Sequence, residues 1–319
     1  MTEGQIDMDR QQDGDTGVGS GITCAIVVTY NPDLDRLAEL LEAILPQVSR
    51  IVVVDNGSSV DIPAWVSARG YRDVRVSPLG VNKGIATAHN IGIGYAKEIG
   101  AEYVVLLDQD SLPAPDMVEK LRAAVEFKVK EGYAVAAAGP RYADERMQNP
   151  PPFIRVNGLS VCRQLCDNAS SIVEVDYLIS SGCLLSLAAL NAVGDMQEDL
   201  FIDYVDIEWG LRAKGLGYQS FGVCAAKMEH NLGDQPFVFM SKRIPSHNPL
   251  RHYYHFRNAV WLYRRQWVPL HWKCADGIRL LLKYGFYTLY AKPRFEHLRM
   301  MTLGIWHGLL GRMGRFEKS

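Results

Sequence analysis

Three short apolar runs in the first third of the chain constrain its fold more than any other feature. They are ITCAIVV (22–28), IVVV (51–54) and VVLL (104–107), and each has the length of a buried strand rather than of a helix. Between the first two runs, residues 34–45 repeat leucine and isoleucine at helical spacing. Continuous apolar strands that alternate with helices are typical of α/β domains. The sequence therefore predicts an α/β fold with a mostly parallel central sheet and flanking helices.

The segments that follow continue this alternation as far as about residue 230. The segment 82–100 is rich in small residues, and Ala86, Ala88 and Gly92 are expected to pack against the sheet. We expect a weak strand at 74–80, helices at 82–100 and 116–131, a strand at 133–142, a loop at 144–170, a strand pair or strand–helix unit at 173–190, a helix from near Asp203 to Gly215, and a strand that runs into His230.

Composition divides the chain into a tail, a large domain and a basic region. A chain of 319 residues that is 48% hydrophobic and 22% charged can bury a full core. Residues 1–21 are polar and lack periodicity, which predicts a disordered tail. Residues 22–240 are expected to form the large domain, and residues 241–319 a basic, aromatic and helical C-terminal region.

The net charge of -2 conceals a strong asymmetry between these regions. From Lys242 onward the chain holds 15 Lys and Arg against 3 Asp and Glu, whereas the preceding residues hold 19 against 33. The basic residues alternate with aromatic and aliphatic ones, which fits an interfacial helix on anionic lipid, a nucleic-acid surface, or a helical subdomain with a charged outer face. The aromatic and aliphatic content favours the membrane or the packing interpretation. No uninterrupted run of about 18 apolar residues is present, so no membrane-spanning helix is predicted.

The 6 cysteines are scattered, without a C-x-x-C pair or zinc-like spacing. The N-terminal residues do not resemble a signal peptide. We therefore expect reduced thiols in a cytoplasmic protein.

Polar side chains follow three of the predicted strands where each strand ends. Asn31 follows the first strand, Asp55 ends the second, and Asp108 and Asp110 follow the run at 104–107. Ligands of parallel sheets bind beyond the carboxyl ends of the strands, so these side chains indicate one site at that edge. Asp108 and Asp110 fit a divalent cation, which prefers hard oxygen ligands, although capping of the following helix is the alternative. Asp55 fits a nucleobase N–H or a ribose hydroxyl, or else closes a plain tight turn.

Further positions carry possible chemistry, each with a structural alternative. Lys83, near a helix N-terminus, suits a diphosphate but equally a solvated surface. Asp203 and Asp206 are three residues apart and are expected to share a helix face, where a carboxylate can act as a general base or stabilise the first turn. His230, at a strand end, suits a metal ligand if the fold brings it near Asp110, and is otherwise structural or solvated.

These polar residues belong to seven short stretches: VVTYNP (27–32), VVVDNGS (52–58), NKGIATAHNIGI (82–93), LLDQDS (106–111), ISSGCLLS (179–186), FIDYVDIEW (201–209) with the following LR, and an H..GD that begins at His230. In order and spacing they resemble the family-2 glycosyltransferases, which are inverting enzymes of the GT-A fold. Within that family they are similar to the bacterial rhamnosyltransferases that build O-antigen and other surface polysaccharides. The resemblance spans about residues 22–235 and extends to RHYYHFRNAVWLYR (251–264).

The resemblance implies which residue takes the proton from the acceptor. It assigns the catalytic base to Asp206. Asp203 remains a rival, because Val205 stands where many relatives carry a glutamate. It also divides the large domain into a nucleotide-binding half (22–112) and an acceptor half (113–240).

The resemblance further implies a divalent cation, Mg²⁺ or Mn²⁺. The D-x-D pair would hold it, with Asp110 the more direct ligand and His230 able to approach the metal or the diphosphate. The residues expected to bind the nucleotide sugar are Thr29, Tyr30, Asn31, Asp55, Asn82, Lys83 and Asp108, and those expected to contact the donor or acceptor sugar are Gly182, Glu208 and Trp209.

The function expected from the resemblance is transfer of L-rhamnose from dTDP-L-rhamnose to a hydroxyl of a lipid-diphosphate-linked saccharide. The basic C-terminal region would then contact the cytoplasmic face of the inner membrane, as a peripheral protein that binds no nucleic acid. A dehydrogenase or a nucleotidyltransferase is the alternative within α/β enzymes, but TYNP (29–32) stands where a dinucleotide fingerprint would be and a P-loop is missing. A non-catalytic nucleotide-sugar or membrane-binding module is the other alternative. The presence of acids at positions 55, 108, 110 and 206 argues against it, because a degenerate site would not need to keep them.

Overall fold

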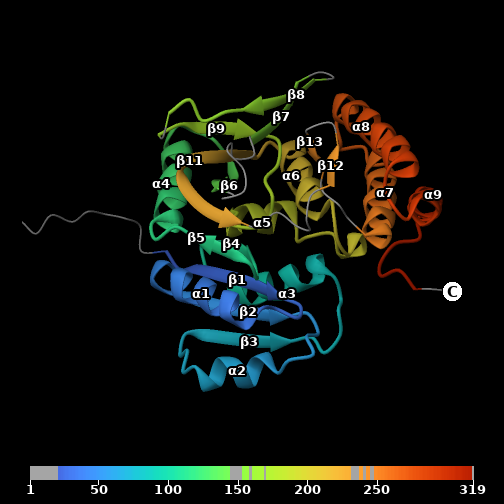
Figure 1. The fold of residues 1–319 in the computed structure, drawn as a ribbon. Coiled ribbons are helices and arrows are strands. Elements are labelled where there is room, and N and C mark those ends of the chain that lie inside the picture. Colours follow the sequence, from blue (N-terminus) through green and yellow to red (C-terminus); the bar gives the residue numbers. More distant parts are fainter. Residues whose placement is uncertain are drawn as a thin grey trace, which may run out of the picture.

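A computed structural model describes residues 21–143, 153–157, 160–168, 170–230, 237–239, 242–244 and 248–317. The predicted tail, apart from Gly21, and the GD of the H..GD stretch lie outside these ranges. The described chain has helices on both sides of a sheet, and three further helices at the C-terminal end pack beside it (Figure 1).

The central sheet is mostly parallel, as predicted. Its N-terminal half is parallel throughout, because the strands there alternate with helices. One short strand, Leu184–Ser186, then lies antiparallel to both of its neighbours. The longest strand, Gln219–His230, lies parallel to its neighbour Val135–Ala143. The strands in their order across the sheet are β3 (Val74–Pro78), β2 (Arg50–Asp55), β1 (Thr23–Thr29), β4 (Tyr103–Asp108), β10 (Leu184–Ser186), β6 (Val135–Ala143), β11 (Gln219–His230) and β5 (Ser111–Pro113), with β9 (Ile172–Val175) also paired to β11.

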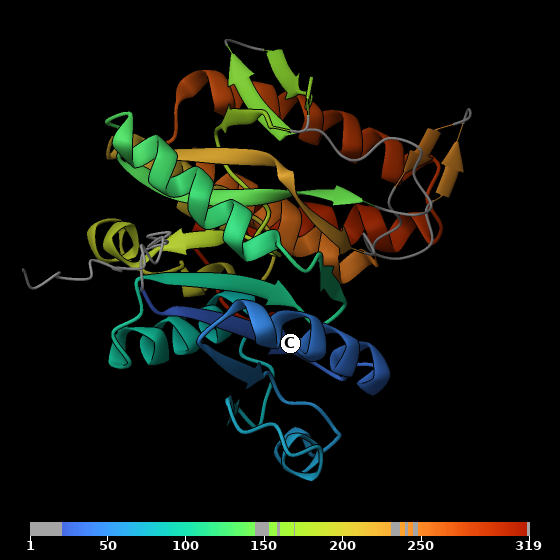
Figure 2. The same cartoon turned by 90° about the vertical axis from the view of Figure 1, so that its left-hand side faces the viewer.

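Helices bury both faces of this sheet, which confirms the predicted α/β class. One face is covered by α1 (Leu34–Ile44), α2 (Ile62–Ala68) and α4 (Met117–Lys130). Figure 2 shows α1 and α4 in front of the strands. The other face is covered by α3 (Ile85–Glu98), α5 (Leu187–Val193) and α6 (Val205–Gly215), and single 3₁₀ turns occur at Leu45–Gln47 (η1) and Glu198–Leu200 (η2).

Local sequence explains why α1 and α3 lie where they do. Asp33 caps α1, since its carboxylate accepts from the N–H groups of Asp35 and Arg36 at 3.0 and 3.2 Å. On α3, a Cβ at Gly92 would lie 2.3 Å from the side chain of Ile26 in β1. Only glycine allows this close approach, so the predicted packing of small residues against the sheet is confirmed.

A short helix and a hairpin are two of the elements that were not predicted from the sequence. α2 has only seven residues, which is too short for helical periodicity to show, and Asp61 caps it by accepting from Ala64 N–H at 2.9 Å. The second is a hairpin of β7 (Phe153–Asn157) and β8 (Ser160–Gln164), which lies in the segment expected to be a loop. The loop prediction is therefore wrong for these residues.

The helix predicted to begin near Asp203 begins two residues later. Asp203 and Tyr204 have φ values of 62° and 65°, which lie outside the right-handed helical region, and α6 starts at Val205. The expectation that Asp203 and Asp206 share one helix face is therefore wrong.

The prediction of six reduced cysteines is also wrong. Cys166 and Cys224 form a disulfide, with their Cα atoms 5.7 Å apart. Antiparallel pairing of β9 with β11 brings the chain that precedes β9 alongside Cys224, whose N–H donates to the Ser171 carbonyl at 3.0 Å. Spacing along the sequence carried no sign of this pair. The other four cysteines are free thiols.

The C-terminal region is helical from Pro249 onward, as predicted, whereas the strand Lys242–Ile244 within it was not expected. It consists of α7 (Pro249–Tyr263), α8 (Leu270–Leu289) and α9 (Arg294–Leu310), preceded by a small hairpin of β12 (Phe237–Phe239) and β13 (Lys242–Ile244). Among the described residues, none of the helices has both the length and the apolar character needed to cross a membrane.

Candidate active site

The ends of β1, β2 and β4 lie side by side at one edge of the sheet. Thr29 pairs with Asp55 in the parallel register of β1 and β2, and Val28 pairs with Asp108 in that of β1 and β4. Adjacent strands lie about 4.8 Å apart, so Asp55 and Asp108 flank the end of β1 at roughly twice that spacing. The structure therefore brings these strand-end carboxylates together.

Hydroxyl groups orient the buried carboxylate of Asp55. Thr29 Oγ1 donates to Asp55 Oδ1 at 3.0 Å, the Ser58 hydroxyl donates to the same oxygen, and Ser58 N–H donates to Oδ2 at 3.1 Å. The Ser58 oxygen accepts from Asn31 N–H at 2.8 Å, and Asn31 Oδ1 accepts from Ser59 N–H at 2.9 Å. Thr29 is thus a buried support for Asp55, and Asn31 fixes the loop that follows β2.

A second network holds the loop before α3 against the loop after β2. Asn56 Oδ1 accepts from Lys83 N–H at 2.8 Å, and Asn56 Nδ2 donates to Asn82 Oδ1 at 3.2 Å. The two loops meet closely at Gly57, which has a φ of 89° and whose Cβ would lie 2.8 Å from the Asn82 nitrogen. The exposed Lys83 side chain is therefore held next to the first turn of α3, beside the Asp55 network.

The D-Q-D loop, which consists of residues 108–110, is joined to the end of β1 by a hydrogen bond to its middle residue. The Gln109 side-chain oxygen accepts from Tyr30 N–H at 2.7 Å. Asp108 is half-buried and its N–H donates to Ser181 Oγ at 3.4 Å, whereas Asp110 is exposed. The Tyr30 side chain is also exposed, so it is open to a ligand at this edge.

Tyr142 and Ser181, which the sequence did not single out, also lie at this edge of the sheet. Tyr142, at the end of β6, donates its hydroxyl to the Ser181 carbonyl at 2.6 Å. The next residue, Gly182, has a φ of 72°, and a Cβ there would lie 2.7 Å from Pro140 and 2.8 Å from the sulfur of Met228. Gly182 thus allows the tight turn that presents Ser181. Tyr142 could have been found, because it ends a predicted strand at the same sheet edge.

Asp206 lies in the first turn of α6 and is half-buried. Burial is the largest influence on its carboxyl group and raises its pKa to about 6. The N–H of Ile207, which donates to Asp206 Oδ1 at 2.8 Å, lowers the pKa, and the nearby charge of Asp203 raises it. A carboxylate with this pKa is ionised at neutral pH yet basic enough to accept a proton.

Asp108 and Asp206 both contact the turn at Ser180 and Ser181, although they are far apart in the sequence. Asp108 N–H donates to Ser181 Oγ at 3.4 Å, and a backbone hydrogen bond from Ser180 lowers the pKa of Asp206. Burial is the main cause of the raised pKa of Tyr142, and the charges of Cys183, Asp108 and Asp206 add to it. The Asp206 charge also raises the pKa values of Cys183 and Tyr177, which burial raises first. The fold therefore places the D-Q-D loop and the α6 carboxylate around one set of side chains.

The raised pKa of Asp206 predicts a gain in stability when its charge is removed. The unfolded chain ionises near the ordinary value of 3.8, whereas the folded chain keeps its proton until about pH 6. Ionisation therefore lowers the free energy of unfolding as pH rises through this window, by roughly 3 kcal/mol in full. We expect Asp206→Asn to raise the free energy of unfolding in urea at pH 7.5 and to leave it nearly unchanged at pH 4. A gain of the same size at both pH values would contradict this.

The rival base, Asp203, is held by an arginine of α7. Arg251 Nη2 and Nε both lie 3.3 Å from Asp203 Oδ1, and the Asp203 side chain is 15% exposed. The Asp203 carboxylate is therefore bound by α7, whereas the Asp206 carboxylate accepts a hydrogen bond from the backbone of Ser180.

The donor set at the D-Q-D loop fits a divalent cation. Carboxylate oxygens are the ligands that Mg²⁺ and Mn²⁺ prefer, and such ions commonly take their other ligands from water and substrate phosphates. The backbone of His230 pairs with Ser111, next to Asp110, but the His230 side chain lies outside the described residues. Among the side chains that are described, no group of three or more His, Cys, Asp or Glu residues is gathered to hold a metal.

Glu208 and Trp209 do not join this cluster. Glu208 is buried and bound by Arg212, whose Nε and Nη2 donate to its two oxygens at 2.8 and 3.0 Å. Trp209 is buried too, and its indole N–H donates to the Gly194 carbonyl at 2.8 Å. Both side chains are committed to packing α6 against the segment after α5, so their placement does not support the predicted contact with sugar.

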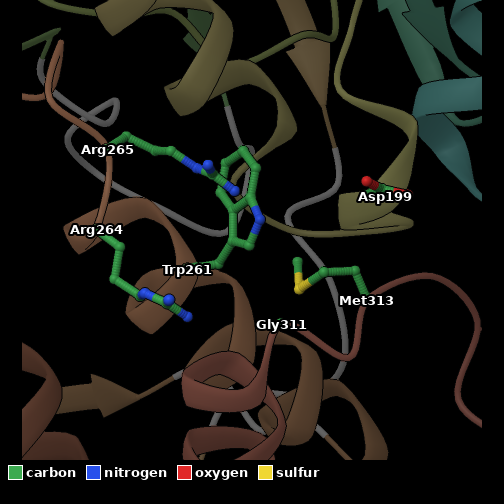
Figure 3. Close-up of a pocket in the computed structure, with 6 residues that line it drawn as sticks. All are labelled: Asp199, Trp261, Arg264, Arg265, Gly311 and Met313. Atoms are coloured by element: carbon green, nitrogen blue, oxygen red, sulfur yellow. The ribbon is translucent and has the colours of Figure 1, made fainter.

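A pocket of about 500 Å³ lies apart from the sheet edge. It opens between the C-terminal end of α7, the chain after α9 and Asp199 of η2 (Figure 3). The guanidinium of Arg265 lies 3.6 Å from the ring centre of Trp261, and Arg264 and Met313 complete the wall. None of the predicted site residues lines it.

Comparison with known proteins identifies the family. Residues 24–165 match the family described as Glycosyl transferase family 2. The chain is also 33% identical over 292 residues to the dTDP-rhamnosyl transferase RfbF of Shigella flexneri, which covers 91% of this chain and 96% of RfbF. The chain belongs to glycosyl transferase family 2.

This glycosyltransferase is also similar to a second rhamnosyltransferase in sequence and to a solved glycosyltransferase in structure. It is 23% identical over 285 residues to the N-acetylglucosaminyl-diphospho-decaprenol L-rhamnosyltransferase of Mycobacterium tuberculosis (strain CDC 1551 / Oshkosh), with 80% of this chain and 90% of that protein covered. Among solved structures, GalNAc-T7 with UDP, GalNAc and Mn²⁺ superposes with a TM-score of 0.61 at 13% identity, covering 91% of this chain and 57% of that one. The fold is the GT-A fold, as predicted.

Proposed function

We propose that this family 2 glycosyltransferase transfers L-rhamnose from dTDP-L-rhamnose to a hydroxyl of a lipid-diphosphate-linked saccharide, with inversion at the anomeric carbon. The donor is supported by the likeness to a dTDP-rhamnosyl transferase along nearly the whole chain. The acceptor class is supported by the likeness to a rhamnosyltransferase whose name specifies a diphospho-decaprenol acceptor.

The observation that carries this proposal is that Asp108 and Asp206 both contact the Ser180–Ser181 turn: Asp108 N–H donates to Ser181 Oγ at 3.4 Å, and a backbone hydrogen bond from Ser180 lowers the pKa of Asp206. A single displacement needs charge stabilisation at the leaving diphosphate and a base on the opposite side of the sugar. The D-Q-D loop meets the first requirement and Asp206 the second. Asp206 accepts the proton of the acceptor hydroxyl as that oxygen attacks, and no covalent intermediate is needed.

The remaining site residues bind and orient the donor. Asp55, fixed by Thr29 and Ser58, accepts hydrogen bonds from the base or ribose, and Tyr30 and Asn31 border the same face. Lys83 and the N-terminus of α3 favour the diphosphate by charge and by the helix dipole. A divalent cation held by Asp108 and Asp110 would neutralise charge that develops on the leaving diphosphate.

A donor screen tests this function. Purified full-length protein is mixed with a lipid-linked saccharide, Mg²⁺ or Mn²⁺, and one nucleotide sugar at a time, and release of nucleoside diphosphate is followed. We expect acceptor-dependent release from dTDP-L-rhamnose well above that from UDP-linked hexoses. Equal release from every donor, or preference for a UDP-sugar, would contradict the assignment of rhamnose.

We further propose that α8 attaches the enzyme to the cytoplasmic face of the inner membrane, as a peripheral contact. Its exposed leucines and isoleucine lie on one face of the helix, because their positions follow the 3.6-residue period. Their exposed fractions lie between 55% and 74%. These residues form the α8 stripe, which consists of Leu270, Ile278, Leu281, Leu282 and Leu289. The basic side chains of Arg279, Lys292 and Arg294 are exposed, and these residues are close to the stripe in the sequence.

An apolar stripe beside cationic side chains predicts binding to anionic lipid. Leu281→Glu is expected to lower the affinity for vesicles containing anionic lipid by about tenfold, since a leucine that would insert is replaced by a repelled charge. Co-sedimentation with vesicles measures this. Val129→Glu is the matched control, because Val129 is also exposed but lies on α4, on the opposite side of the protein (Figure 1). Equal binding by Leu281→Glu and the wild type would contradict the proposal.

A further inference from the structure

The chain that enters α6 has an unusual backbone. In the Asp199–Tyr204 segment, three residues that are not glycine have φ in the left-handed region: Phe201 at 65°, Asp203 at 62° and Tyr204 at 65°. Such conformations are unfavourable for residues with a Cβ and persist only where surrounding contacts impose them. Asp206 follows two residues later, so the path of this segment determines where its carboxylate points.

A single asparagine of α7 binds the backbone of this segment at three points. Asn258 is fully buried, and its Nδ2 lies 2.9 Å from the Leu200 carbonyl, 2.7 Å from that of Ile202 and 2.9 Å from that of Asp203. Each of these carbonyls belongs to the residue that directly precedes a left-handed one. The side-chain amide thus supplies the hydrogen bonds that a regular helix or strand would otherwise provide.

The preceding residue of α7 binds the start of the same segment. Arg257 is fully buried, and its Nη2 donates to the carbonyls of Asp199 and Leu200 at 3.2 and 2.9 Å. Its Nη1 donates to the Gly314 carbonyl at 2.5 Å, and its Nε donates to Asn258 Oδ1 at 2.9 Å. The guanidinium therefore orients the asparagine amide as well as the segment itself.

Other side chains of α7 contact the segment along its length. Arg251 pairs with Asp203, and the ring of Tyr254 stacks on Phe201 with ring centres 5.1 Å apart. The His255 ring lies 4.9 Å from that of Tyr204. Positions 251, 254, 255 and 258 follow helical spacing, so one face of α7 is fitted to this segment.

The segment is also attached to the donor side of the site. The Phe201 carbonyl accepts from Ile85 N–H, in the first turn of α3, at 2.7 Å. Gly84 allows this approach, since a Cβ there would lie 2.6 Å from the same carbonyl oxygen. The segment therefore bridges α7 and the loop that carries Lys83.

We propose that Arg257 and Asn258 are positioning residues for the catalytic base: by binding the carbonyls of the Asp199–Tyr204 segment, they aim the Asp206 carboxylate at the acceptor hydroxyl. The inference rests on the proposed role of Asp206. It makes α7 part of the catalytic unit, although this helix lies outside the strand-end site and contributes no group to the reaction. The C-terminal region then has two separate tasks, with α7 ordering the base and the α8 stripe meeting lipid.

The test compares variants of α7 in the full-length enzyme. Arg257→Lys keeps the charge but loses the fork that reaches two carbonyls, and Asn258→Ser shortens the donor. Arg264→Lys is the matched control, because Arg264, at the C-terminal end of α7, also donates to two backbone carbonyls, but these are Gly308 and Leu309 of α9, at 3.3 and 2.7 Å, and not those of the segment. Thermal melting establishes that each variant is folded, and dTDP affinity, kcat and the pH dependence of kcat are then measured.

We expect kcat to fall at least tenfold in both Arg257→Lys and Asn258→Ser, with dTDP affinity within twofold of the wild type. The acid limb of the kcat profile should also move to lower pH, because a displaced Asp206 is better solvated and ionises more readily. Arg264→Lys should keep both the wild-type kcat and the wild-type acid limb. If Asn258→Ser does not fold, Arg257→Lys decides alone.

Two results would overturn the inference. One is a folded Arg257→Lys with wild-type kcat and an unmoved acid limb. The other is a loss of kcat matched by an equal loss of dTDP affinity, which indicates general damage. Turnover by Asp206→Asn would instead refute the assignment of the base itself, which is a separate outcome.

Discussion

Replacing Asp206 by asparagine is expected to lower kcat by at least about 100-fold, the usual contribution of a general base. The amide has nearly the shape of the carboxylate and its oxygen can still accept from Ile207 N–H, but it cannot take the acceptor proton. Donor affinity should stay within twofold of the wild type, because Asp206 acts on the acceptor. Initial rates with dTDP-L-rhamnose and calorimetric titration of the donor measure the two quantities.

Asp203→Asn provides the comparison. Its carboxylate is paired with Arg251, so we expect this variant to retain most of its turnover. The reverse pattern, with turnover retained in Asp206→Asn and lost in Asp203→Asn, would transfer the role of base to Asp203.

Asp110→Ala is expected to abolish the effect of divalent metal on donor binding. In the wild type, Mg²⁺ or Mn²⁺ should tighten donor binding by about two orders of magnitude, since the cation links the D-Q-D carboxylates to the diphosphate. The variant should bind the donor equally weakly with and without metal. Titration of dTDP-L-rhamnose in EDTA and in Mn²⁺ measures this.

Asp116→Asn is the control for this experiment. Asp116 is an acid of the same connection, but it pairs with Lys120 at the start of α4. It should respond to metal as the wild type does. Equal donor affinity with and without metal in the wild type would contradict the metal assignment itself.

The α/β fold and the strand-end part of the site were predictable, because both depend on local pattern. Apolar runs identify buried strands, and polar residues at their ends must meet at one edge of a parallel sheet. Asp55 and Asp108 lie on either side of β1 for this reason. The link to Asp206 was predicted only through the family resemblance, since no spacing rule connects α6 to that edge.

The parts that were missed depend on contacts between distant segments. The left-handed backbone at Asp203 and Tyr204 arises from α7 side chains about fifty residues further along the chain, so local propensity predicted a helix there instead. The Cys166–Cys224 disulfide likewise follows from the pairing of β9 with β11. The burial of Glu208 against Arg212 and of Trp209 against Gly194 is likewise a property of the tertiary structure, and their contact with sugar stays a prediction from the resemblance.

The most direct test of the account is the anomeric configuration of the product. The enzyme is incubated with dTDP-L-rhamnose, metal and a saccharide acceptor, and the new linkage is determined by NMR from the coupling at its anomeric carbon. A single displacement assisted by Asp206 predicts that rhamnose is transferred with the configuration opposite to that in the donor. Transfer with retention, or no transfer of rhamnose at all, would contradict it.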